Sequence, residues 1–208
     1  FRMHLDPTDG LPRNVAEPVV DMLYPNDKSA RIPIVAVTGT NGKTTTVRLI
    51  SHIMKNANKK VGFTSSDGIY IQNQLLQKGD CSGPKSGEFV LKDPTVDFAV
   101  LECARGGMLR SGLGFSQCDI GVVTNVAPDH LGLKGINTLE QLAKVKAIVP
   151  ESVSSNGYAI LNADDELVVK MGNSLNCNIA LFSMNEKNKV VNEHCKSGGV
   201  AAVYENGF

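Results

Sequence analysis

The sequence contains no tryptophan, and only 5% of its 208 residues are aromatic. Its 21 basic and 21 acidic residues balance, so the formal net charge is zero, and neither sign is concentrated in a run. A protein that binds nucleic acid or an anionic membrane typically has an excess of lysine and arginine on one surface. The composition therefore predicts no nucleic-acid partner and no membrane partner, and it favours a small ligand.

Long apolar runs are also absent from the sequence. No stretch approaches the roughly 20 apolar residues that a membrane span requires, and the first residues lack the basic-then-apolar pattern of a secretory signal. The cysteines include no C-x-x-C pair, which indicates neither a disulfide framework nor a zinc site. We expect a cytoplasmic protein whose cysteines are small buried hydrophobic residues. They are Cys81, Cys103, Cys118, Cys177 and Cys195.

The composition of the chain changes near residue 30. Residues 1–30 contain four prolines, which is too much interruption for a core element, and we interpret them as a linker or leading arm. Residues 31–190 carry the pattern of a principal domain, and residues 191–208 are interpreted as a trailing segment. Because the chain starts with phenylalanine, we expect it to be an excerpt of a longer protein.

Short apolar runs alternate with helical patterns after residue 31. Runs that are apolar on both faces predict buried strands of a parallel sheet covered by helices. Apolar residues recur at helical spacing in 47–57 and, less cleanly, in 139–149, so the series predicts an α/β fold with a mostly parallel sheet. Residues 69–76 predict a small hairpin extension that turns at Gln72 and Asn73. The predicted strands are 32–37, 61–64, 98–102, 120–123, 158–162 and 178–182, with a further strand near the end.

The stretch VTGTNGKTTT, residues 37–46, lies between the first predicted strand and the first predicted helix. Backbone amides and the helix dipole converge on an anion at such a junction. Two glycines allow close approach to phosphate oxygens, Lys43 can reach the terminal phosphates of ATP, and the Thr44 hydroxyl can bind Mg²⁺. The stretch predicts a P-loop, although Val37 stands where the strict G-x-x-x-x-G-K-[ST] pattern has its first glycine. The predicted nucleotide contacts here are Gly39, Thr40, Asn41, Gly42, Lys43, Thr44 and Thr45.

Four motifs in order, over roughly residues 31–185, resemble the central domain of the ATP-dependent Mur ligases and folylpolyglutamate synthetases. T-G-T-N-G-K-T is the first of them. By this resemblance, Glu102 in LECARGG binds magnesium and His130 in TNVAPDHLG binds a second magnesium. Lys146 in LEQLAKVKAIV matches a lysine that is carbamylated in many members. These three residues and Lys43 are the predicted catalytic set, and Thr44, Glu102 and His130 are the predicted metal ligands.

The fourth motif, LNADD at 161–165, is similar to the adenine and ribose contact of the family. The resemblance implies that Asn162 and Asp165 bind nucleotide, and that residues 191–208 lead toward a further domain that closes over it. Structural interpretations stay open for all of these residues. Glu102 could be a solvated strand end, His130 a surface histidine, and Lys146, like Lys144, a solvated cation; Asn162 and Asp165 could cap a helix.

Segments outside the shared motifs resemble the cyanophycin synthetase family, among them KGDCSGPKS, LKDPTVDFAVLECARGGMLRSGLGF and GGVAAVYENG. Members of that family combine an ATP-grasp half, which extends an aspartate backbone, with a Mur-like half, which attaches arginine to each aspartate β-carboxylate. The resemblance implies that residues 1–30 follow an ATP-grasp region and that the substrates are ATP, arginine and an aspartate-backbone polymer or primer. It also implies a homo-oligomer for the full-length enzyme. We expect the isolated piece to be inactive.

Two glycine-rich segments between the motifs predict loops. Arg105 and Arg110 lie in one, where they could hold the acidic polymer or the transferred phosphate, or be ordinary surface arginines. Ser82 and Lys85 lie in the other, with a similar role open. Other functions also stay open for the chain: a different Mur or folylpolyglutamate-type ligase, a P-loop kinase or NTPase, and a nucleotide-binding module without catalysis.

Overall fold

The computed structural model describes residues 31–128, 131–132 and 135–205, which are called the described residues below. The chain divides into two units, Phe1–Ile32 and Pro33–Phe208. The second unit contains every helix and strand discussed here.

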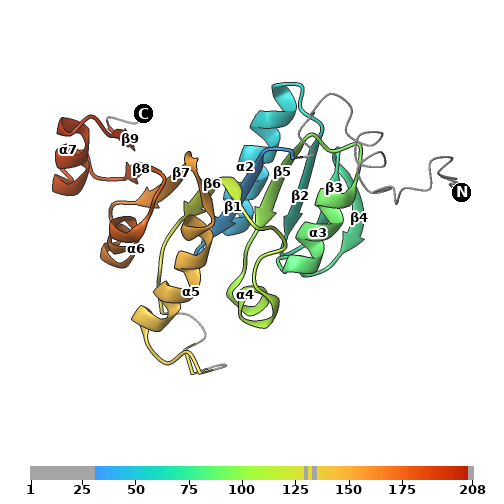
Figure 1. Ribbon diagram of the computed structural model, residues 1–208, viewed down its shortest axis with the longest axis horizontal. Helices are drawn as coiled ribbons and strands as arrows, with labels where there is room; N and C mark the ends of the chain where they lie inside the picture. The colour runs from blue at the N-terminus through green and yellow to red at the C-terminus, as the bar shows by residue number, and fades with distance from the viewer. Residues whose placement is uncertain (1–30, 129–130, 133–134, 206–208) are drawn as a thin grey trace, which may run out of the picture. The chain divides into compact units, whose positions relative to one another are not determined.

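The second unit is built on a nine-stranded sheet with the order β4-β3-β2-β5-β1-β6-β7-β8-β9 (Figure 1). All pairings from β2 across to β9 are parallel, whereas β3 and β4 continue the edge beyond β2 as antiparallel strands. The predicted α/β class with a mostly parallel sheet is therefore confirmed. The strands are β1 (Ile34–Thr38), β2 (Val61–Ser65), β3 (Gly68–Ile71), β4 (Gln74–Lys78), β5 (Phe98–Glu102), β6 (Cys118–Val123), β7 (Val153–Asn162), β8 (Asn178–Ser183) and β9 (Val200–Val203).

The hairpin extension is also confirmed, and its turn is where the sequence predicts it. Gln72 and Asn73 join β3 to β4 with φ angles of 47° and 72°. Asparagine tolerates this left-handed region better than most residues, and a two-residue hairpin turn commonly requires positive φ at both central positions. The turn therefore fixes the antiparallel edge next to β2.

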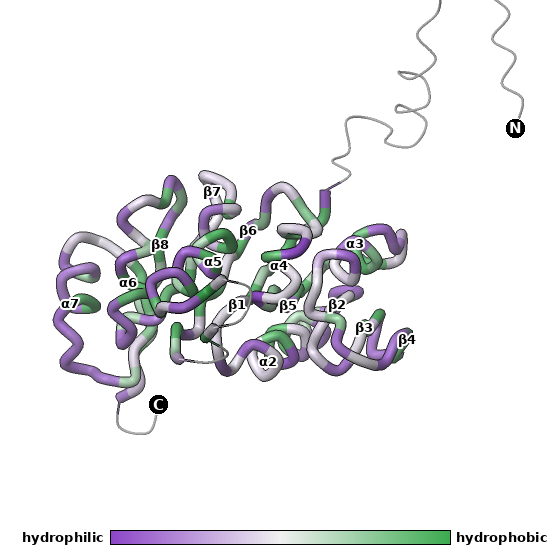
Figure 2. The backbone as a smooth tube through the Cα atoms, turned by 90° about the horizontal axis from the view of Figure 1, so that it is seen from below, coloured by the Kyte–Doolittle hydropathy of each residue, from purple (hydrophilic) through white to green (hydrophobic). Residues whose placement is uncertain are grey.

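Helices cover the two faces of the sheet unequally. Figure 2 shows α2 on one face of the sheet, and α3, α4 and α5 on the other. The helix α2 packs on β1, β2 and β5, and α5 packs on β1, β6 and β7. The helices are α2 (Lys43–Asn56), α3 (Pro84–Lys92), α4 (Arg105–Ser111), α5 (Leu139–Glu151), α6 (Glu166–Met171) and α7 (Lys189–Lys196), with a 3₁₀ turn, η2 (Gly172–Ser174).

The central strands are buried along their whole length. Every residue of β1 and β5 is buried, as expected for parallel strands between helical layers. One apolar cluster joins β1, β2 and β5 to Val47 of α2, and a second joins β6, β7 and β8 to Leu142 of α5. The two clusters hold the carboxyl ends of the strands in place, and the candidate site lies at those ends.

Two segments that the sequence predicts as loops contain helices. Residues 84–92 form α3, with Pro84 in its first turn, and residues 105–111 form α4. A Cβ on Gly107 would lie 2.8 Å from Cα of Gly83, so the absent side chain lets α4 pack directly on the loop before α3. This packing outweighs the cost of about 1 kcal/mol that each glycine adds to a helix.

The C-terminal part of the unit continues the sheet past the predicted boundary at residue 190. Helix α7 and strand β9 follow β8, and β9 pairs with β8 in parallel. The division at 190 stays a prediction, as does the role of residues 1–30, which lie outside the described residues.

The described helices are short. The longest of them, α2, has 14 residues, whereas a helix needs about 20 apolar residues to cross a bilayer. No helix in the described part of the chain meets the length and hydropathy of a membrane span.

The cysteines follow the sequence expectation only in part. Cys81, Cys103 and Cys118 are buried, Cys177 is half-buried and Cys195 is exposed. The expectation is therefore wrong for Cys195, which lies in the last turn of the short, mostly polar helix α7.

Candidate active site

The loop between β1 and α2 owes its shape to two glycines. Gly39 has a φ of 147° and Gly42 a φ of 85°, both in the region that favours glycine. A Cβ on Gly39 would lie 1.8 Å from Oγ1 of Thr124, so the loop lies directly on the segment after β6. The backbone amide of Thr40 donates to the carbonyl of Asn125 over 3.0 Å, which holds the two segments together.

Thr124 and Asn125 also belong to the candidate site, and the sequence analysis did not predict them. The Thr124 hydroxyl donates to the carbonyl of Asn41 over 2.6 Å, and Oδ1 of Asn125 accepts from the Asn41 amide over 3.0 Å. Both residues follow a buried parallel strand next to β1, and ligands of open α/β sheets bind at such carboxyl ends. Their position after the predicted strand 120–123 was the signal that could have identified them.

Lys43 and Thr44 are the first residues of α2, and both face the carboxyl edge of the sheet. The Lys43 ammonium donates to the carbonyl of Thr40 over 2.8 Å, so it lies over the loop. The Thr44 hydroxyl donates to Oε2 of Glu102 over 2.8 Å. Glu102 is the last residue of β5. Its carboxylate lies at the site, and the residue is only 3% exposed.

Ser66 joins this pair, and the sequence analysis did not predict it. Its hydroxyl lies 3.0 Å from the Thr44 hydroxyl, and its amide donates to Oε2 of Glu102 over 3.2 Å. Magnesium prefers oxygen ligands and is usually held by one or two carboxylates together with water and phosphate oxygens. Two hydroxyls and one carboxylate fit such an ion. Within the described residues, no group of three or more histidine, cysteine, aspartate or glutamate side chains could hold a metal ion by itself.

Lys146 brings α5 to the same site. It is 3% exposed, whereas Lys144 is exposed, so the interpretation of Lys146 as a solvated cation is wrong. Together with the loop and Glu102, Lys146 lines a cavity of about 370 Å³, called the phosphate cavity below. The cavity is lined by Gly39, Thr40, Lys43, Ser66, Asp80, Ser82, Glu102, Ala104, Arg105, Gly106, Leu142 and Lys146.

A second hollow lies on the α2 side of the same loop. It has a volume of about 760 Å³ and is called the apolar trough below. Asn41, Gly42 and Asn162, three of the predicted nucleotide contacts, stand at its polar end. The rest of its lining comes from the sheet, from α2 and from the segment after β6: Val35, Thr46, Ile50, Met54, Phe98, Ile120, Val122, Thr124, Asn125, Ile160 and Phe182.

Asn162 and Asp165 hold the segment after β7 against the segment after β6. Nδ2 of Asn162 donates to the carbonyl of Thr124 over 2.8 Å. One carboxylate oxygen of Asp165 caps α6, and the other accepts from the Val126 amide over 2.7 Å. The predicted capping role of Asp165 is therefore present, and a nucleotide contact by Asp165 stays a prediction.

Four predicted residues are not placed in either hollow. Thr44 and Asp165 line neither of them, although Thr44 hydrogen-bonds to Glu102. Thr45 is exposed on α2 and lines neither the phosphate cavity nor the apolar trough. His130 lies outside the described residues, so its predicted metal binding stays a prediction.

Hydrogen bonding and burial set the charge states next to the site. The Ser65 hydroxyl, followed by Tyr70 and Arg48, holds the pKa of Asp67 below its usual range, which keeps an anion in the turn after Ser66. Burial raises the pKa of the Cys103 thiol, with further contributions from Cys118 and Glu102. Cys103 is therefore a neutral thiol, and it offers no thiolate nucleophile beside Glu102.

Comparisons with known proteins place the chain in a family. Residues 37–205 match the Mur ligase middle domain. The chain is 59% identical over all 208 residues to a cyanophycin synthetase of Geminocystis herdmanii and 57% identical to one of Synechocystis sp., and in both cases it spans 24% of the relative's length. A solved UDP-N-acetylmuramoyl-L-alanyl-D-glutamate--2,6-diaminopimelate ligase has 26% identity and a TM-score of 0.63, over 82% of this chain and 35% of that one.

Proposed function

This chain belongs to the Mur ligase family, whose middle domain it contains, and on that premise we propose that it is the nucleotide-binding domain of an ATP-dependent amide ligase. In this proposal the ligase attaches arginine to aspartate side chains of a cyanophycin-type polymer. Identity of 57–59% to cyanophycin synthetases over the whole chain supports the choice of substrates. Because the chain spans only 24% of those relatives, the activity and substrates of the whole protein are part of the proposal.

The phosphates of ATP would lie on the loop 39–45. Backbone amides at the start of α2 point at this position, and Lys43 can turn from the Thr40 carbonyl toward the β- and γ-oxygens. The base would lie in the polar end of the apolar trough, where Asn41 and Asn162 offer amide groups beside Ile160 and Phe182. An apolar hollow with few polar groups is the usual form of a site for a flat aromatic ligand.

Thr44, Glu102 and Ser66 would hold a magnesium ion beside those phosphates. A bound Mg²⁺ neutralises phosphate oxygens and lowers the repulsion between a triphosphate and an approaching carboxylate. The contribution of the protein is to place one buried carboxylate and two hydroxyls within hydrogen-bond distance of each other before the ion binds.

Amide formation then requires an activated carboxylate. An oxygen of the aspartate β-carboxylate attacks the γ-phosphorus of ATP, the bond to the β-phosphate oxygen breaks, and ADP leaves. The uncharged amine of arginine attacks the resulting acyl phosphate, phosphate departs, and the amine proton passes to solvent or phosphate. Lys43 and the amides of the loop stabilise the charge that develops on the transferred phosphoryl group.

Lys146 and His130 complete the proposal. Carbamylation of Lys146 would convert a buried cation into an oxygen ligand for a second magnesium, for which His130 would be a further ligand. Chemical rescue of Lys146→Ala by a small carboxylate would support this role, and the same carboxylate should leave Lys144→Ala unchanged.

The hydrogen bond of 2.8 Å between Thr44 and Glu102 carries the proposal, because it joins the P-loop to an acidic strand end inside one cavity with Lys43 and Lys146. The test uses the complete gene product that contains these 208 residues, with ATP, Mg²⁺, arginine and a short aspartate-backbone primer. We expect mass spectrometry to detect arginine addition, which Lys43→Ala abolishes. The exposed Lys55 of the same helix provides the matched control, because Lys55→Ala should retain activity.

Other results would replace the proposal. Addition of a different amino acid would identify another Mur or folylpolyglutamate-type ligase. ATP consumption without any amide product would indicate a kinase or NTPase. Nucleotide binding without turnover in the complete gene product would indicate a binding module.

A further inference from the structure

A second pocket adjoins the phosphate cavity. It has a volume of about 380 Å³ and lies between the start of α3 and the helix α4; it is called the outer pocket below. Asp80, Ser82, Ala104 and Gly106 line both hollows, so the two are adjacent. A substrate that approaches the phosphates from this side would leave part of itself in the outer pocket.

The outer pocket has a basic wall. Lys85 in the first turn of α3 and Arg110 in the last turn of α4 both line it. The Nε of Arg110 donates to the carbonyl of Gly106 over 3.2 Å, which fixes the guanidinium on the pocket side of the helix. Lysine and arginine in one small pocket favour an anionic ligand, and the arginine fork suits a carboxylate.

The single acidic residue in the lining does not cancel this charge. Oδ1 of Asp80 accepts from both the amide and the hydroxyl of Ser82, at 3.1 and 2.5 Å. These bonds turn one carboxylate oxygen toward the loop and also aim the Ser82 side chain. Among the residues that line the outer pocket, Lys85 and Arg110 therefore remain as two cations against one hydrogen-bonded carboxylate.

Contact between two glycines keeps this pocket in shape. Gly107 of α4 lies so close to Gly83 that any Cβ on Gly107 would also approach Cδ of Pro84 to 3.1 Å. The contact fixes the distance between the helices that carry Lys85 and Arg110. The basic wall is thus held by packing and not by a loose loop.

We propose that the outer pocket binds the second carboxylate of the acceptor, and that Lys85 and Arg110 thereby decide which carboxylate reacts. The inference rests on the proposed function. A terminal aspartate of the polymer carries two carboxylates, the β-carboxylate that is activated and the α-carboxylate at the chain end. Only one of the two carboxylates can lie at the γ-phosphate, and the basic wall holds the other in the outer pocket.

The experiment compares two primers in the complete gene product. One ends in an aspartate with a free α-carboxylate, and the other is its C-terminal amide. We expect the amide to have a KM about tenfold higher, because it loses a charge-assisted hydrogen bond. In Arg110→Gln and Lys85→Gln the KM of the free acid should rise to that of the amide, so that the two primers become similar, while the KM for ATP stays within about twofold of the unmodified protein.

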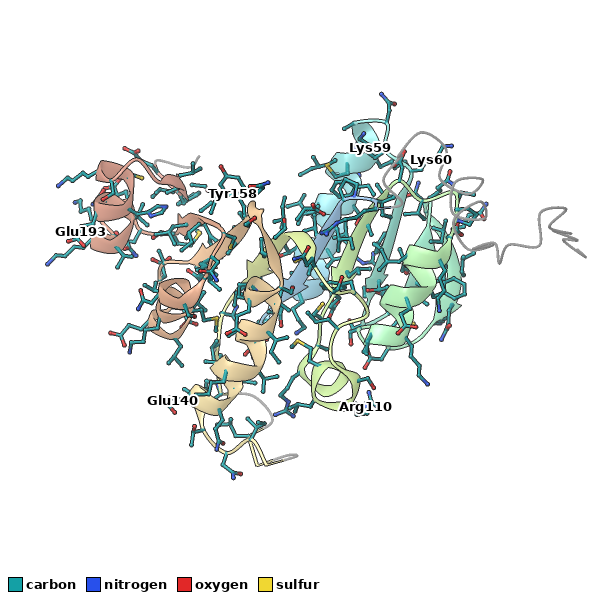
Figure 3. All side chains as sticks on the ribbon, viewed as in Figure 1. Lys59, Lys60, Arg110, Glu140, Tyr158 and Glu193 are labelled. Atoms are coloured by element: carbon teal, nitrogen blue, oxygen red, sulfur yellow. The ribbon has the colours of Figure 1, made fainter. Side chains whose placement is uncertain are left out.

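Control variants separate a pocket effect from a general charge effect. Lys92→Gln removes a cation from the same helix as Lys85, outside the pocket. Lys59 and Lys60 precede β2, and Figure 3 shows them at the opposite ends of the strands from Arg110. Lys92→Gln, Lys59→Gln and Lys60→Gln should leave the preference for the free acid unchanged.

The possible results are distinguishable. If the unmodified protein adds no arginine to either primer, the proposed function fails. If it adds arginine to both primers equally well, or if Arg110→Gln raises the KM for arginine and not for the primer, the outer pocket does not hold the second acceptor carboxylate. Loss of the preference in both pocket variants, and in none of the controls, supports the inference.

Discussion

The two hollows on either side of the P-loop differ in the chemistry of their walls. The phosphate cavity collects Lys43, Glu102 and Lys146 from α2, β5 and α5, whereas the apolar trough is walled by side chains such as Ile160 and Phe182. One loop therefore separates a site for charge from a site for an apolar surface. Under the proposed function, the phosphates of ATP would lie in the first hollow and its base in the second.

The comparison also shows how differently the two hollows are encoded. In the phosphate cavity, Lys43 begins α2, Glu102 ends β5 and Lys146 lies within α5, and each of them belongs to a short sequence motif. The trough arises from alternate residues of several strands that only the sheet order brings together. Its function depends on topology more than on any motif.

The largest effect should come from removing the acidic side of the phosphate cavity. We expect Glu102→Gln to lower kcat at least about 100-fold, because a neutral amide cannot replace the carboxylate as a magnesium ligand. The matched variant is Glu88→Gln, an exposed glutamate of α3 that lines neither hollow. Steady-state rates over a range of Mg²⁺ concentrations check this, and a Glu102→Gln enzyme with normal kcat and normal Mg²⁺ dependence would contradict it.

In the loop that separates the hollows, Gly39→Ala should lower the free energy of unfolding more than Gly42→Ala. Gly39→Ala adds both backbone strain and a clash with Thr124, so we expect a loss of about 3 kcal/mol or more in the free energy of unfolding. Gly42→Ala adds strain without a close contact and should cost about 1 kcal/mol.

Denaturant titration of both loop variants measures this difference. Gly79→Ala is the control, because it has positive φ and no neighbour within 4 Å, away from the loop. Equal losses at Gly39 and Gly42 would show that the contact with the segment after β6 does not hold the loop.

A change in the trough should weaken ATP binding without changing the chemistry. We expect Phe182→Ala to raise the KM for ATP about threefold to tenfold, through loss of apolar contact with the base, at unchanged kcat. Leu49→Ala alters an exposed leucine of α2 outside the trough and should have no effect. A lower kcat at unchanged KM in Phe182→Ala would mean that the base lies elsewhere.

Much of the fold was predictable from the sequence because buried parallel strands are continuous apolar runs. The predicted strands 98–102 and 178–182 agree with the structure to within one residue, and the turn at Gln72 and Asn73 was identified by its residue types. The start of β7 was missed by five residues, since 153–157 contains two serines, an asparagine and a glycine that read as a loop.

The helices α3 and α4 could not be predicted from the sequence, because tertiary contacts stabilise them. The sequence around Gly83 and Gly107 has the composition of a loop, whereas the close contact between the two segments and the packing of α3 on β2, β3 and β5 stabilise the helices. Ser66 was missed for a similar reason. Its position next to Thr44 depends on the pairing of β2 with β5, which no local pattern contains.

The central claim is that the site activates a carboxylate as an acyl phosphate. Its most direct test uses a primer whose reacting carboxylate carries ¹⁸O in both oxygens, with ATP and arginine in the complete gene product. The account predicts that each amide formed transfers one ¹⁸O atom from the primer to inorganic phosphate, as measured by mass spectrometry. Phosphate without ¹⁸O, formed while amide accumulates, would contradict it.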